Sequence, residues 1–347
     1  MADRTYDQGL TSLGWSDGWE AKRRVVSSKG TPSRVVRHDG VKVLVSDGST
    51  LVHATFARSL GLAVGDWVLV ENETVTDRLE RSSQLERDNL DAGPQVIAAN
   101  VELVLVVFGA DRPLKKRKVQ RFVAFAWDIG AKPVVVISKS DLHDDIGALV
   151  STVVDWVGDV EIIATSVESG DGIDLVFDAL TNKTGTLIGE SGAGKSSLVN
   201  ALMEDEVAWV GDVRETDAKG RHTTTHRELH LLAGGAMIID NPGIRALGLS
   251  SEGEGVELLF ADIEAATLHC RFRDCAHRTE PGCAVLAAVS AGTISGDRVD
   301  AYHHFVDEQA EAASRATAKD RTAASRKEST AARRAREAIV DPDLSTN

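Results

Sequence analysis

Gly189-Glu-Ser-Gly-Ala-Gly-Lys-Ser-Ser197 decides the fold of this 347-residue chain. It fits G-x-x-x-x-G-K-[ST], the phosphate-binding loop of P-loop nucleotidases. Apolar residues precede it and follow it at helical spacing from Leu198, so its context is strand, loop and helix, as the motif requires. Backbone N–H groups in such a loop converge on phosphate oxygens at the start of a helix. The sequence therefore predicts a nucleoside triphosphate site, with a chance glycine-rich turn as the alternative.

The residues of this loop have distinct expected roles. Lys195 would reach the β- and γ-phosphates and assist the reaction, and the Ser196 hydroxyl would ligate Mg²⁺. We expect the whole loop to contact the nucleotide, that is Gly189, Glu190, Ser191, Gly192, Ala193, Gly194, Lys195, Ser196 and Ser197.

A segment that could read the base lies upstream of the loop. An apolar run from Val134 ends in Ser138-Lys139-Ser140-Asp141. In such a K-x-D segment the Asp carboxylate accepts two N–H bonds from guanine, each contributing about 1.5–3 kcal/mol as a charge-assisted hydrogen bond. A second apolar run ends in Ser166 and Val167, where a base-contacting loop would lie. These patterns favour guanine, and an ordinary strand-end turn remains the alternative.

The remaining parts of a GTPase follow the loop. An apolar run from Met237 ends in D-x-P-G, in which Asp240 would hold Mg²⁺ and the Gly243 N–H would meet the γ-phosphate. The polar segment 219–225 lies where a switch loop belongs, and Thr223 and Thr224 are its candidate nucleotide contacts. The base reader thus precedes the phosphate loop, which is a circular permutation of the usual order. Termini that lie close together make such a rearrangement tolerable.

All three cysteines fall within residues 270–283, as Cys270-x4-Cys275-x-His277-x5-Cys283. Three thiolates and one imidazole form a complete tetrahedral set for a structural Zn²⁺. An odd number of cysteines argues against disulfides in an intracellular chain. His269 is a rival imidazole, and buried structural thiols without a metal are the alternative.

The N-terminal part has the pattern of short strands joined by tight turns. β-branched runs lie at 41–45 and 50–56, with Asp39-Gly40 before the first and Asp47-Gly48 between them as hairpin turns, and residues 65–70 supply another strand. A five-stranded barrel of the OB type fits, as does an SH3-like barrel or a simple hairpin sheet. OB barrels commonly bind RNA. The basic residues available for this are Arg34, Arg37, Lys42 and Arg58, each of which could equally belong to a solvated surface.

The permuted order together with GESGAGKSS, GRHTTT and DNPG resembles the RsgA (YjeQ) family of small-ribosomal-subunit-dependent GTPases. The likeness extends to Gln95-Val-Ile-Ala-Ala-Asn100 and to the cysteine cluster, where the family pattern matches His277, and it covers residues from about 33 to about 310. Two positions depart from it: Ser138 stands where most GTPases have Asn, which would soften guanine affinity, and Val167 stands where Ala is usual.

The residue that would activate water is also indicated by the resemblance. Ras-like enzymes place a water-orienting Gln directly after the D-x-x-G glycine, but here that position is Ile244. The resemblance points instead to His222 in GRHTTT, whose imidazole could accept or relay the proton. A surface histidine is the alternative. Low turnover without a partner follows if this loop is ordered only on binding.

The resemblance implies three folded domains: an OB-type β-barrel, a central α/β circularly permuted P-loop GTPase domain and a C-terminal α-helical zinc-binding domain. We expect a disordered segment at 1–32, the barrel at 33–96, the GTPase domain at 97–249, the zinc-binding domain at 250–312, and a basic helical tail with a disordered end at 313–347. The tail carries eight basic and two acidic residues between 313 and 336. It could follow RNA phosphates or remain solvated.

Composition adds limits on location and partners. The formal net charge is −14, and no apolar run approaches the roughly 18 residues of a membrane span. Reduced thiols, zinc and GTP indicate the cytoplasm. The resemblance implies a GTPase that is stimulated by the 30S subunit and acts in late maturation of that subunit, with GTP or GDP, the 30S subunit and its 16S rRNA as partners, and we expect a monomer. Two alternatives remain: a GTPase of large-subunit assembly, which would lack the barrel and the Cys₃His set, and an RNA-binding module that nucleotide only regulates.

Overall fold

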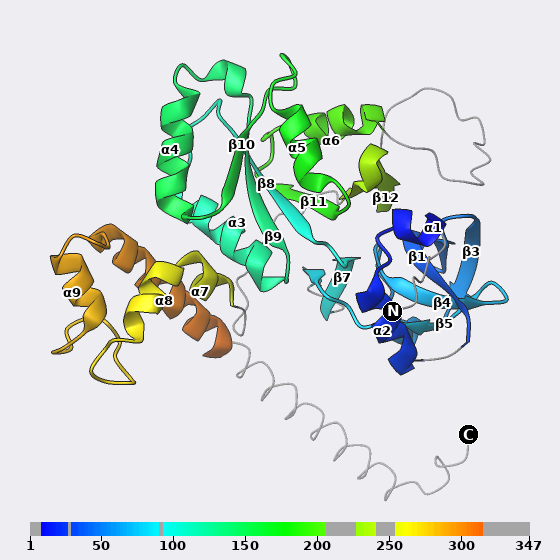
Figure 1. The fold of residues 1–347 in the computed structure, drawn as a ribbon, viewed down its shortest axis with the longest axis horizontal. Helices are drawn as coiled ribbons and strands as arrows, with labels where there is room; N and C mark the ends of the chain where they lie inside the picture. Colours follow the sequence, from blue (N-terminus) through cyan, green and yellow to red (C-terminus); the bar gives the residue numbers. More distant parts are fainter. Residues whose placement is uncertain (1–7, 27–28, 90–92, 206–226, 241–253, 315–347) are drawn as a thin grey trace, which may run out of the picture. The chain divides into compact units, whose positions relative to one another are not determined.

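The structure is a computed structural model that describes residues 8–26, 29–89, 93–205, 227–240 and 254–314. The chain divides into two compact units, Met1–Gly248 and Leu249–Asn347, and each is described by itself. The first unit contains a β-barrel and an α/β sheet, and the second is helical (Figure 1).

The five strands at the start of the chain form the predicted barrel. Their order is β1-β2-β3-β5-β4, and β1 pairs with β4 to close the ring, with Thr31 opposite Val70 and Arg34 opposite Trp67. Valines that alternate along the strands fill the interior, because every second side chain points inward. The prediction of an OB-type barrel is confirmed. Its strands are β1 (Thr31–His38), β2 (Lys42–Ser46), β3 (Leu51–Phe56), β4 (Trp67–Glu71) and β5 (Thr74–Arg78).

The segment before the barrel is helical in its described part, so the prediction that residues 1–32 are disordered is wrong for 8–26. Helices α1 (Gln8–Ser12) and α2 (Asp17–Val26) lie on the outside of the barrel. Leu13 and Trp15 between them are buried, and Trp15 meets Trp67 edge-on with ring centroids 4.8 Å apart. The physical reason is burial of aromatic surface, which offsets the cost of ordering a polar segment.

The central sheet has the order β10-β9-β8-β11-β13-β12, in which neighbouring strands are parallel except for the antiparallel β12. The carboxyl ends of the parallel strands therefore meet at one edge of the sheet. A separate hairpin of β6 and β7 precedes the sheet in the chain. The strands are β6 (Gln84–Asn89), β7 (Gly93–Ala99), β8 (Leu103–Gly109), β9 (Lys132–Ser138), β10 (Glu161–Ala164), β11 (Thr184–Gly189), β12 (Glu228–Leu231) and β13 (Met237–Asp240).

Helices cover both faces of this sheet, so its central strands are buried on both sides, and β8 is apolar from Leu103 to Phe108. Along β8, Leu103, Leu105 and Val107 pack in one core with residues of α5 and α6. On the other face Phe108 meets Phe122 of α3 edge-on, and α3 packs on α4. The helices are α3 (Lys116–Asp128), α4 (Ile146–Val157), α5 (Ile173–Leu180) and α6 (Lys195–Leu202), with 3₁₀ turns at Arg58–Leu60, Ser140–Leu142, Met203–Asp205 and Ala233–Gly235.

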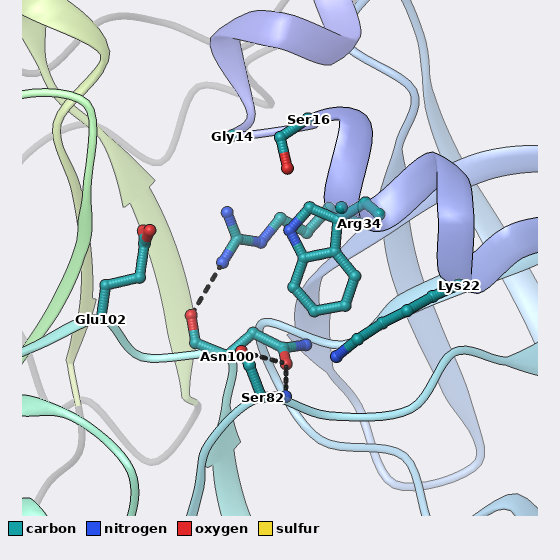
Figure 2. A pocket seen from close by; sticks show the side chains of 9 residues that line it. Gly14, Ser16, Lys22, Arg34, Ser82, Asn100 and Glu102 are labelled. Carbon is teal, nitrogen blue, oxygen red and sulfur yellow. Dashed lines mark hydrogen bonds between the residues drawn. The ribbon is translucent and has the colours of Figure 1, made fainter.

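Arg34 of β1 joins the barrel to the sheet, and Figure 2 shows its side chain beside Asn100. Its guanidinium donates to the Thr184 hydroxyl at 2.8 Å, to the Leu13 carbonyl at 2.5 Å and to the Asn100 carbonyl at 3.4 Å. The residue is only 2 % exposed. The prediction that Arg34 is available to RNA is therefore wrong, because its charge is used within the fold. Arg37 is half-buried, whereas Lys42 and Arg58 are exposed.

The second unit is built from short helices around aromatic side chains. Phe260, Phe305 and Tyr302 lie together, with ring centroids of Phe260 and Tyr302 5.7 Å apart. The helices are α7 (Gly255–Leu259), α8 (Ala261–Thr267), α9 (Ala284–Ser290) and a last helix described over 296–314. Residues 315–347, which include nearly all of the basic tail, lie outside the described residues. Across the described ranges we find no helix with both the length and the apolar character that a bilayer span requires.

Candidate functional site

The phosphate-binding loop connects the carboxyl end of β11 to the first turn of α6. Gly189, Gly192 and Gly194 have φ values of 144°, 76° and 83°, which side chains on Cβ disfavour. A Cβ at Gly189 would lie 2.1 Å from the Val107 carbonyl oxygen of β8. The glycines therefore let the loop turn sharply against the neighbouring strand and leave Ser191 and Ser196 exposed.

Lys195 opens α6 and folds back over the loop. Its Nζ donates to the carbonyls of Gly189 at 2.9 Å and Glu190 at 2.6 Å. Partial burial lowers the pKa of Lys195, and the nearby Glu190 carboxylate opposes this effect. An ammonium held over a loop of backbone N–H groups is positioned to meet phosphate oxygens.

The segment predicted to read the base, Ser138–Asp141, is hydrogen-bonded directly to this loop. The Ser138 hydroxyl lies 2.6 Å from the Ala193 carbonyl and 3.1 Å from the Phe108 carbonyl. A hydroxyl has one proton, so the shorter contact is the better hydrogen bond. Lys139, in the left-handed region with φ 57°, donates from Nζ to the Gly192 carbonyl at 2.8 Å. Ser138 and Lys139 thus hold the two segments in a fixed relation.

Asp141 faces the loop that follows β10. The Ser166 hydroxyl donates to Asp141 Oδ1 at 2.5 Å, and the backbone of Ser140 donates to the Thr165 carbonyl at 3.0 Å. The other oxygen of Asp141 has no partner in the described part of the chain, which leaves it open to a ligand. Val167 is 43 % exposed beside this loop. The structure brings Asp141 and Ser166 into contact, and Val167 follows Ser166 in the same loop.

Asp240 is the last residue of β13, the strand that pairs with β11. The register places Thr186 opposite Ile239, and the Thr186 hydroxyl donates to the Ile239 carbonyl at 2.9 Å. Asp240 therefore ends its strand at the same edge of the sheet as the phosphate-binding loop. The candidate residues His222, Thr223, Thr224 and Gly243 lie outside the described residues.

Sequence reasoning missed three charged residues near the loop. Asp111, just after β8, accepts hydrogen bonds from Lys139 Nζ at 2.9 Å and Arg112 Nη2 at 2.9 Å. The hydrogen bond from Arg112, followed by that from Lys139, holds the pKa of Asp111 well below its usual range. Lys118 of α3 forms an ion pair with Glu190 of the loop. The dense run of basic residues after Asp111 was the available signal.

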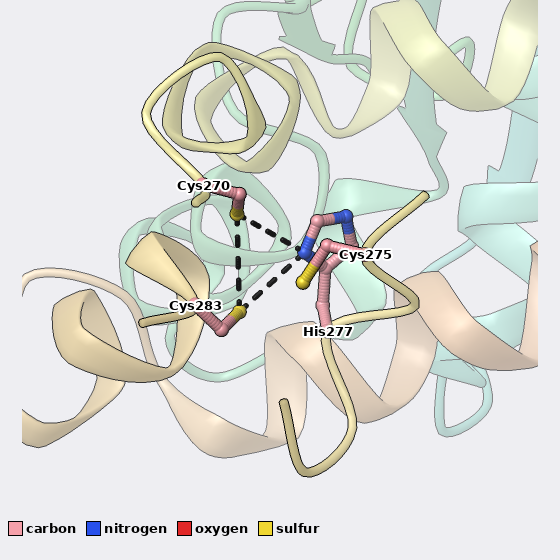
Figure 3. Close-up of side chains that lie close together, drawn as sticks. All are labelled: Cys270, Cys275, His277 and Cys283. Atoms are coloured by element: carbon pink, nitrogen blue, oxygen red, sulfur yellow. Dashed lines mark hydrogen bonds between the residues drawn. The ribbon is translucent and has the colours of Figure 1, made fainter. Parts of the chain in front are cut away.

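The second unit holds a separate cluster of metal-ligand side chains, shown in Figure 3. Ligand atoms of Cys270, Cys275, His277 and Cys283 all lie within 4.8 Å of one another. His277 Nδ1 is 3.5 Å from the sulfurs of Cys270 and of Cys283, and those two sulfurs are 3.9 Å apart. This group could hold a metal ion. His269 is exposed and does not belong to it.

Comparison with known proteins agrees with this geometry. Residues 78–250 match the family model described as RsgA GTPase. The chain is 38 % identical over 315 residues to the small ribosomal subunit biogenesis GTPase RsgA of Streptomyces coelicolor, covering 86 % of each chain. It is 42 % identical over 254 residues to the protein of that name from Methanosarcina acetivorans, covering 71 % of this chain and 69 % of the relative.

Solved structures show the same fold. The crystal structure of YjeQ from Thermotoga maritima matches with a TM-score of 0.62 and 26 % identity, over 80 % of this chain and 98 % of that one. YloQ, described as a circularly permuted GTPase, matches with a TM-score of 0.61 and 23 % identity, over 83 % of this chain and 98 % of that one. The chain belongs to the RsgA GTPase family, and its central domain is a circularly permuted GTPase.

Proposed function

We propose that this GTPase is stimulated by the small (30S) ribosomal subunit and acts in late maturation of that subunit through contacts with its 16S rRNA. One observation carries the proposal: the permuted base-reading segment is bonded to the phosphate-binding loop through Ser138 and Lys139. The names of the relatives supply the ribosomal role. The flanking barrel and Cys₃His group favour it over a GTPase of large-subunit assembly.

The nucleotide would occupy the carboxyl edge of the sheet. Asp141 would accept the guanine N–H groups, with Ser166 and Val167 beside the base. Lys195 would contact the β- and γ-phosphates, while Ser196 and Asp240 would hold Mg²⁺ between them. Thr223, Thr224 and Gly243 would complete the phosphate contacts. A bound Mg²⁺ would neutralise charge on the phosphates.

Water activation is assigned to His222, because Ile244 cannot orient water. A neutral imidazole can accept the proton of the attacking water as the bond to phosphorus forms. If the small subunit orders the segment that carries His222, hydrolysis without the subunit is slow.

The Cys₃His group is assigned to one structural Zn²⁺. Bond lengths of about 2.3 Å for Zn–S and about 2.0 Å for Zn–N at tetrahedral angles place two sulfurs about 3.8 Å apart and sulfur and nitrogen about 3.5 Å apart. The corresponding separations in the structure are 3.9 Å between the sulfurs of Cys270 and Cys283 and 3.5 Å between Cys270 Sγ and His277 Nδ1. Four protein ligands leave no open position, so the metal would stabilise the unit and take no part in the reaction.

Removing one ligand tests the metal assignment. Cys283→Ser should lose the Zn²⁺ and unfold the C-terminal unit, since metal binding supplies folding free energy in small metal domains. Nucleotide binding should persist, because the nucleotide residues belong to the other unit. Elemental analysis of wild type and variant measures this. Carefully prepared wild type without zinc would contradict the assignment.

Single-turnover hydrolysis tests the function itself. GTP decay is measured for the protein alone, with small subunits and with large subunits at equal concentration. The proposal expects strong acceleration by small subunits only. Acceleration by large subunits would instead assign the protein to assembly of the large subunit. If neither subunit accelerates hydrolysis, the result would favour an RNA-binding module in which turnover is incidental.

The proposal also covers location and assembly state: a monomer in the cytoplasm, where GTP and ribosomal subunits are available. Sedimentation of the purified protein checks that it is a monomer, and fractionation of cells checks that it lies in the cytoplasm.

A further inference from the structure

A dense group of cations lies at the start of α3, next to the nucleotide site. Five of the seven residues from 112 to 118 are basic, in a chain whose formal net charge is −14. We name the α3 basic cluster as Arg112, Lys115, Lys116, Arg117 and Lys118. α3 follows the carboxyl end of β8, so its first turn lies at the edge of the sheet where the phosphate-binding loop also lies.

Two members of the cluster contact the nucleotide machinery. Lys118 pairs with Glu190, and Arg112 Nη2 lies 3.5 Å from the Gly192 carbonyl. The other three make no ion pair within the described ranges, and Lys115 and Arg117 are exposed. The cluster thus contacts the loop at two points and presents the charges of Lys115 and Arg117 to solvent.

Helix stability does not explain this arrangement. The start of a helix carries partial positive charge and favours acidic side chains or a capping Ser, Thr, Asp or Asn. α3 has no acidic residue in its first turn, and Lys115 at its N-cap makes no side-chain capping bond. Adjacent cations also repel one another. Both effects oppose folding of this turn and are relieved when an anion binds.

We propose that the α3 basic cluster docks the phosphate backbone of RNA beside the nucleotide site. Closely spaced cations suit a chain of phosphates, whose binding releases condensed counterions. The phosphates of the bound nucleotide are already met by the loop and Lys195, so the exposed cations serve a second polyanion. This inference rests on the proposed function, which supplies RNA as the partner, and it locates the contact next to the residues that carry out hydrolysis.

The test compares two charge-matched double variants. Lys115→Gln/Arg117→Gln removes two exposed cations of the cluster, and neither residue contacts the nucleotide loop. Lys132→Gln/Lys183→Gln removes two cations from the opposite, amino edge of the same sheet, where Lys132 pairs with Glu161. Both variants have the same net charge, and unchanged GTP affinity shows that the site is intact in each.

Binding to purified small ribosomal subunits is measured over a range of salt concentrations with a nonhydrolysable GTP analogue. Each lost phosphate contact lowers the slope of log K against log salt by about 0.7–0.9. The cluster variant should lose about 1.5 in slope and bind at least about tenfold more weakly at low salt, while the control stays close to wild type. An unchanged slope, or equal weakening of both variants, overturns the proposal.

Two further outcomes separate the cluster from the function on which it rests. If the wild-type protein fails to bind small subunits, the proposed function is contradicted, and so is RNA as the partner of the α3 basic cluster. Wild type that binds them while the cluster variant binds equally well would overturn the cluster alone. Binding to anionic phospholipid vesicles that depends on the cluster, without such dependence for RNA, would assign the surface to membranes and overturn the RNA proposal.

Discussion

The two edges of the central parallel sheet are built in opposite ways. At the carboxyl edge, polar groups of the loops remain exposed: Ser191, Ser196 and Asp141 all face solvent. At the amino edge, polar groups are satisfied within the fold: Thr184 is fully buried and bonded to the guanidinium of Arg34 at 2.8 Å. The same strand, β11, therefore begins in a closed polar network and ends in an open loop.

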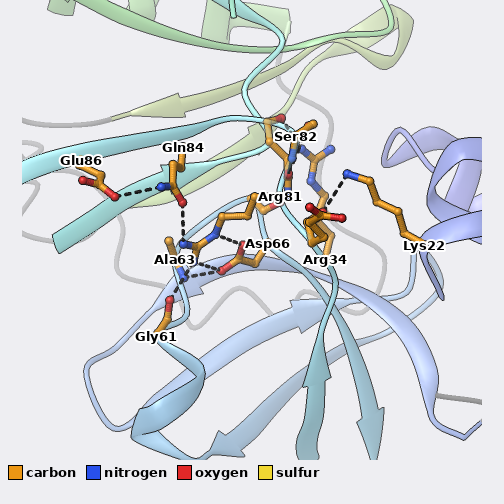
Figure 4. A network of polar contacts seen from close by, with 12 residues as sticks. Lys22, Arg34, Gly61, Ala63, Asp66, Arg81, Ser82, Gln84 and Glu86 are labelled. Atoms are coloured by element: carbon orange, nitrogen blue, oxygen red, sulfur yellow. Dashed lines mark hydrogen bonds and ion pairs between the residues drawn. The ribbon is translucent and has the colours of Figure 1, made fainter. Parts of the chain in front are cut away.

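The closed network extends from the amino edge into the connection between barrel and sheet (Figure 4). Asp66 is fully buried and accepts two 2.7 Å hydrogen bonds from Arg81, from Nε and from Nη2. Asn100 donates to the Gly65 carbonyl at 3.0 Å and accepts from the Ser82 N–H at 3.0 Å. Burial lowers the pKa of Arg34 to about 10, so it remains charged at neutral pH.

We infer from this difference that the carboxyl edge is available to ligands, whereas the amino edge contributes to stability. A polar group that is already hydrogen-bonded inside the protein can bind a ligand only if that bond is broken, which has a large free-energy cost. Substitutions at the two edges should therefore separate affinity and rate from the free energy of unfolding.

The largest effect is expected for His222→Ala. If the imidazole activates water, subunit-stimulated kcat should fall by about 10²–10⁴, the usual weight of general acid–base catalysis. GTP affinity should stay within a few-fold, so the variant should remain on the small subunit in its GTP form. Turnover at saturating subunits and nucleotide affinity are both measured. Full stimulated turnover would return His222 to the class of surface histidines.

Arg34→Ala should act on stability instead. It leaves the Thr184 hydroxyl and two carbonyls without their donor, at about 1–3 kcal/mol for each unsatisfied group, so at least about 3 kcal/mol of unfolding free energy should be lost. GTP affinity of the folded fraction should change little. Arg37→Ala is the matched control, because Arg37 lies on the same strand in a partly exposed pair with Asp39, worth at most about 1 kcal/mol. Denaturant unfolding of both variants decides the point, and equal losses would contradict the assignment.

A smaller effect is expected for Ser138→Ala at the carboxyl edge of the sheet. The hydroxyl that holds the base-reading segment to the Ala193 carbonyl is lost, which costs about 0.5–1.5 kcal/mol, so GTP affinity should fall by about two- to tenfold. Ser138→Asn should restore it if the longer amide reaches the same carbonyl. Nucleotide titration is the measurement, with exposed Ser151→Ala as control. Unchanged affinity in Ser138→Ala would show that this hydrogen bond does not organise the site.

The local motifs of the chain could be read from sequence because each needs few residues at fixed spacing. The phosphate-binding loop, the Ser138–Asp141 segment and the Cys₃His group all belong to this class, as do the Asp-Gly hairpins of the barrel. Long-range burial could not be read this way. Arg34 looked like any surface arginine, because its partners at Thr184 and Asn100 are distant in the chain.

The prediction that the N-terminal segment is disordered failed for a related reason. Residues 8–26 have a polar composition and short helices, and nothing in their own sequence identifies Trp67 as the surface on which Trp15 packs. The tryptophans at 15 and 19 were the signal that this segment is too aromatic for a disordered one. The Lys118–Glu190 pair was equally out of reach, since it depends on how α3 is placed against the loop.

Nucleotide specificity of Asp141→Asn tests the central claim that the permuted base reader and the phosphate-binding loop form one guanine site. Labelled GTP and xanthosine triphosphate are titrated against wild type and variant. We expect GTP affinity to fall by about one to two orders of magnitude, at about 1.4 kcal/mol per decade. Affinity for xanthosine triphosphate should rise, because the Asn amide can donate to the extra carbonyl of xanthine. Unchanged GTP binding, with no gain for xanthosine triphosphate, would remove Asp141 from the site and contradict the account.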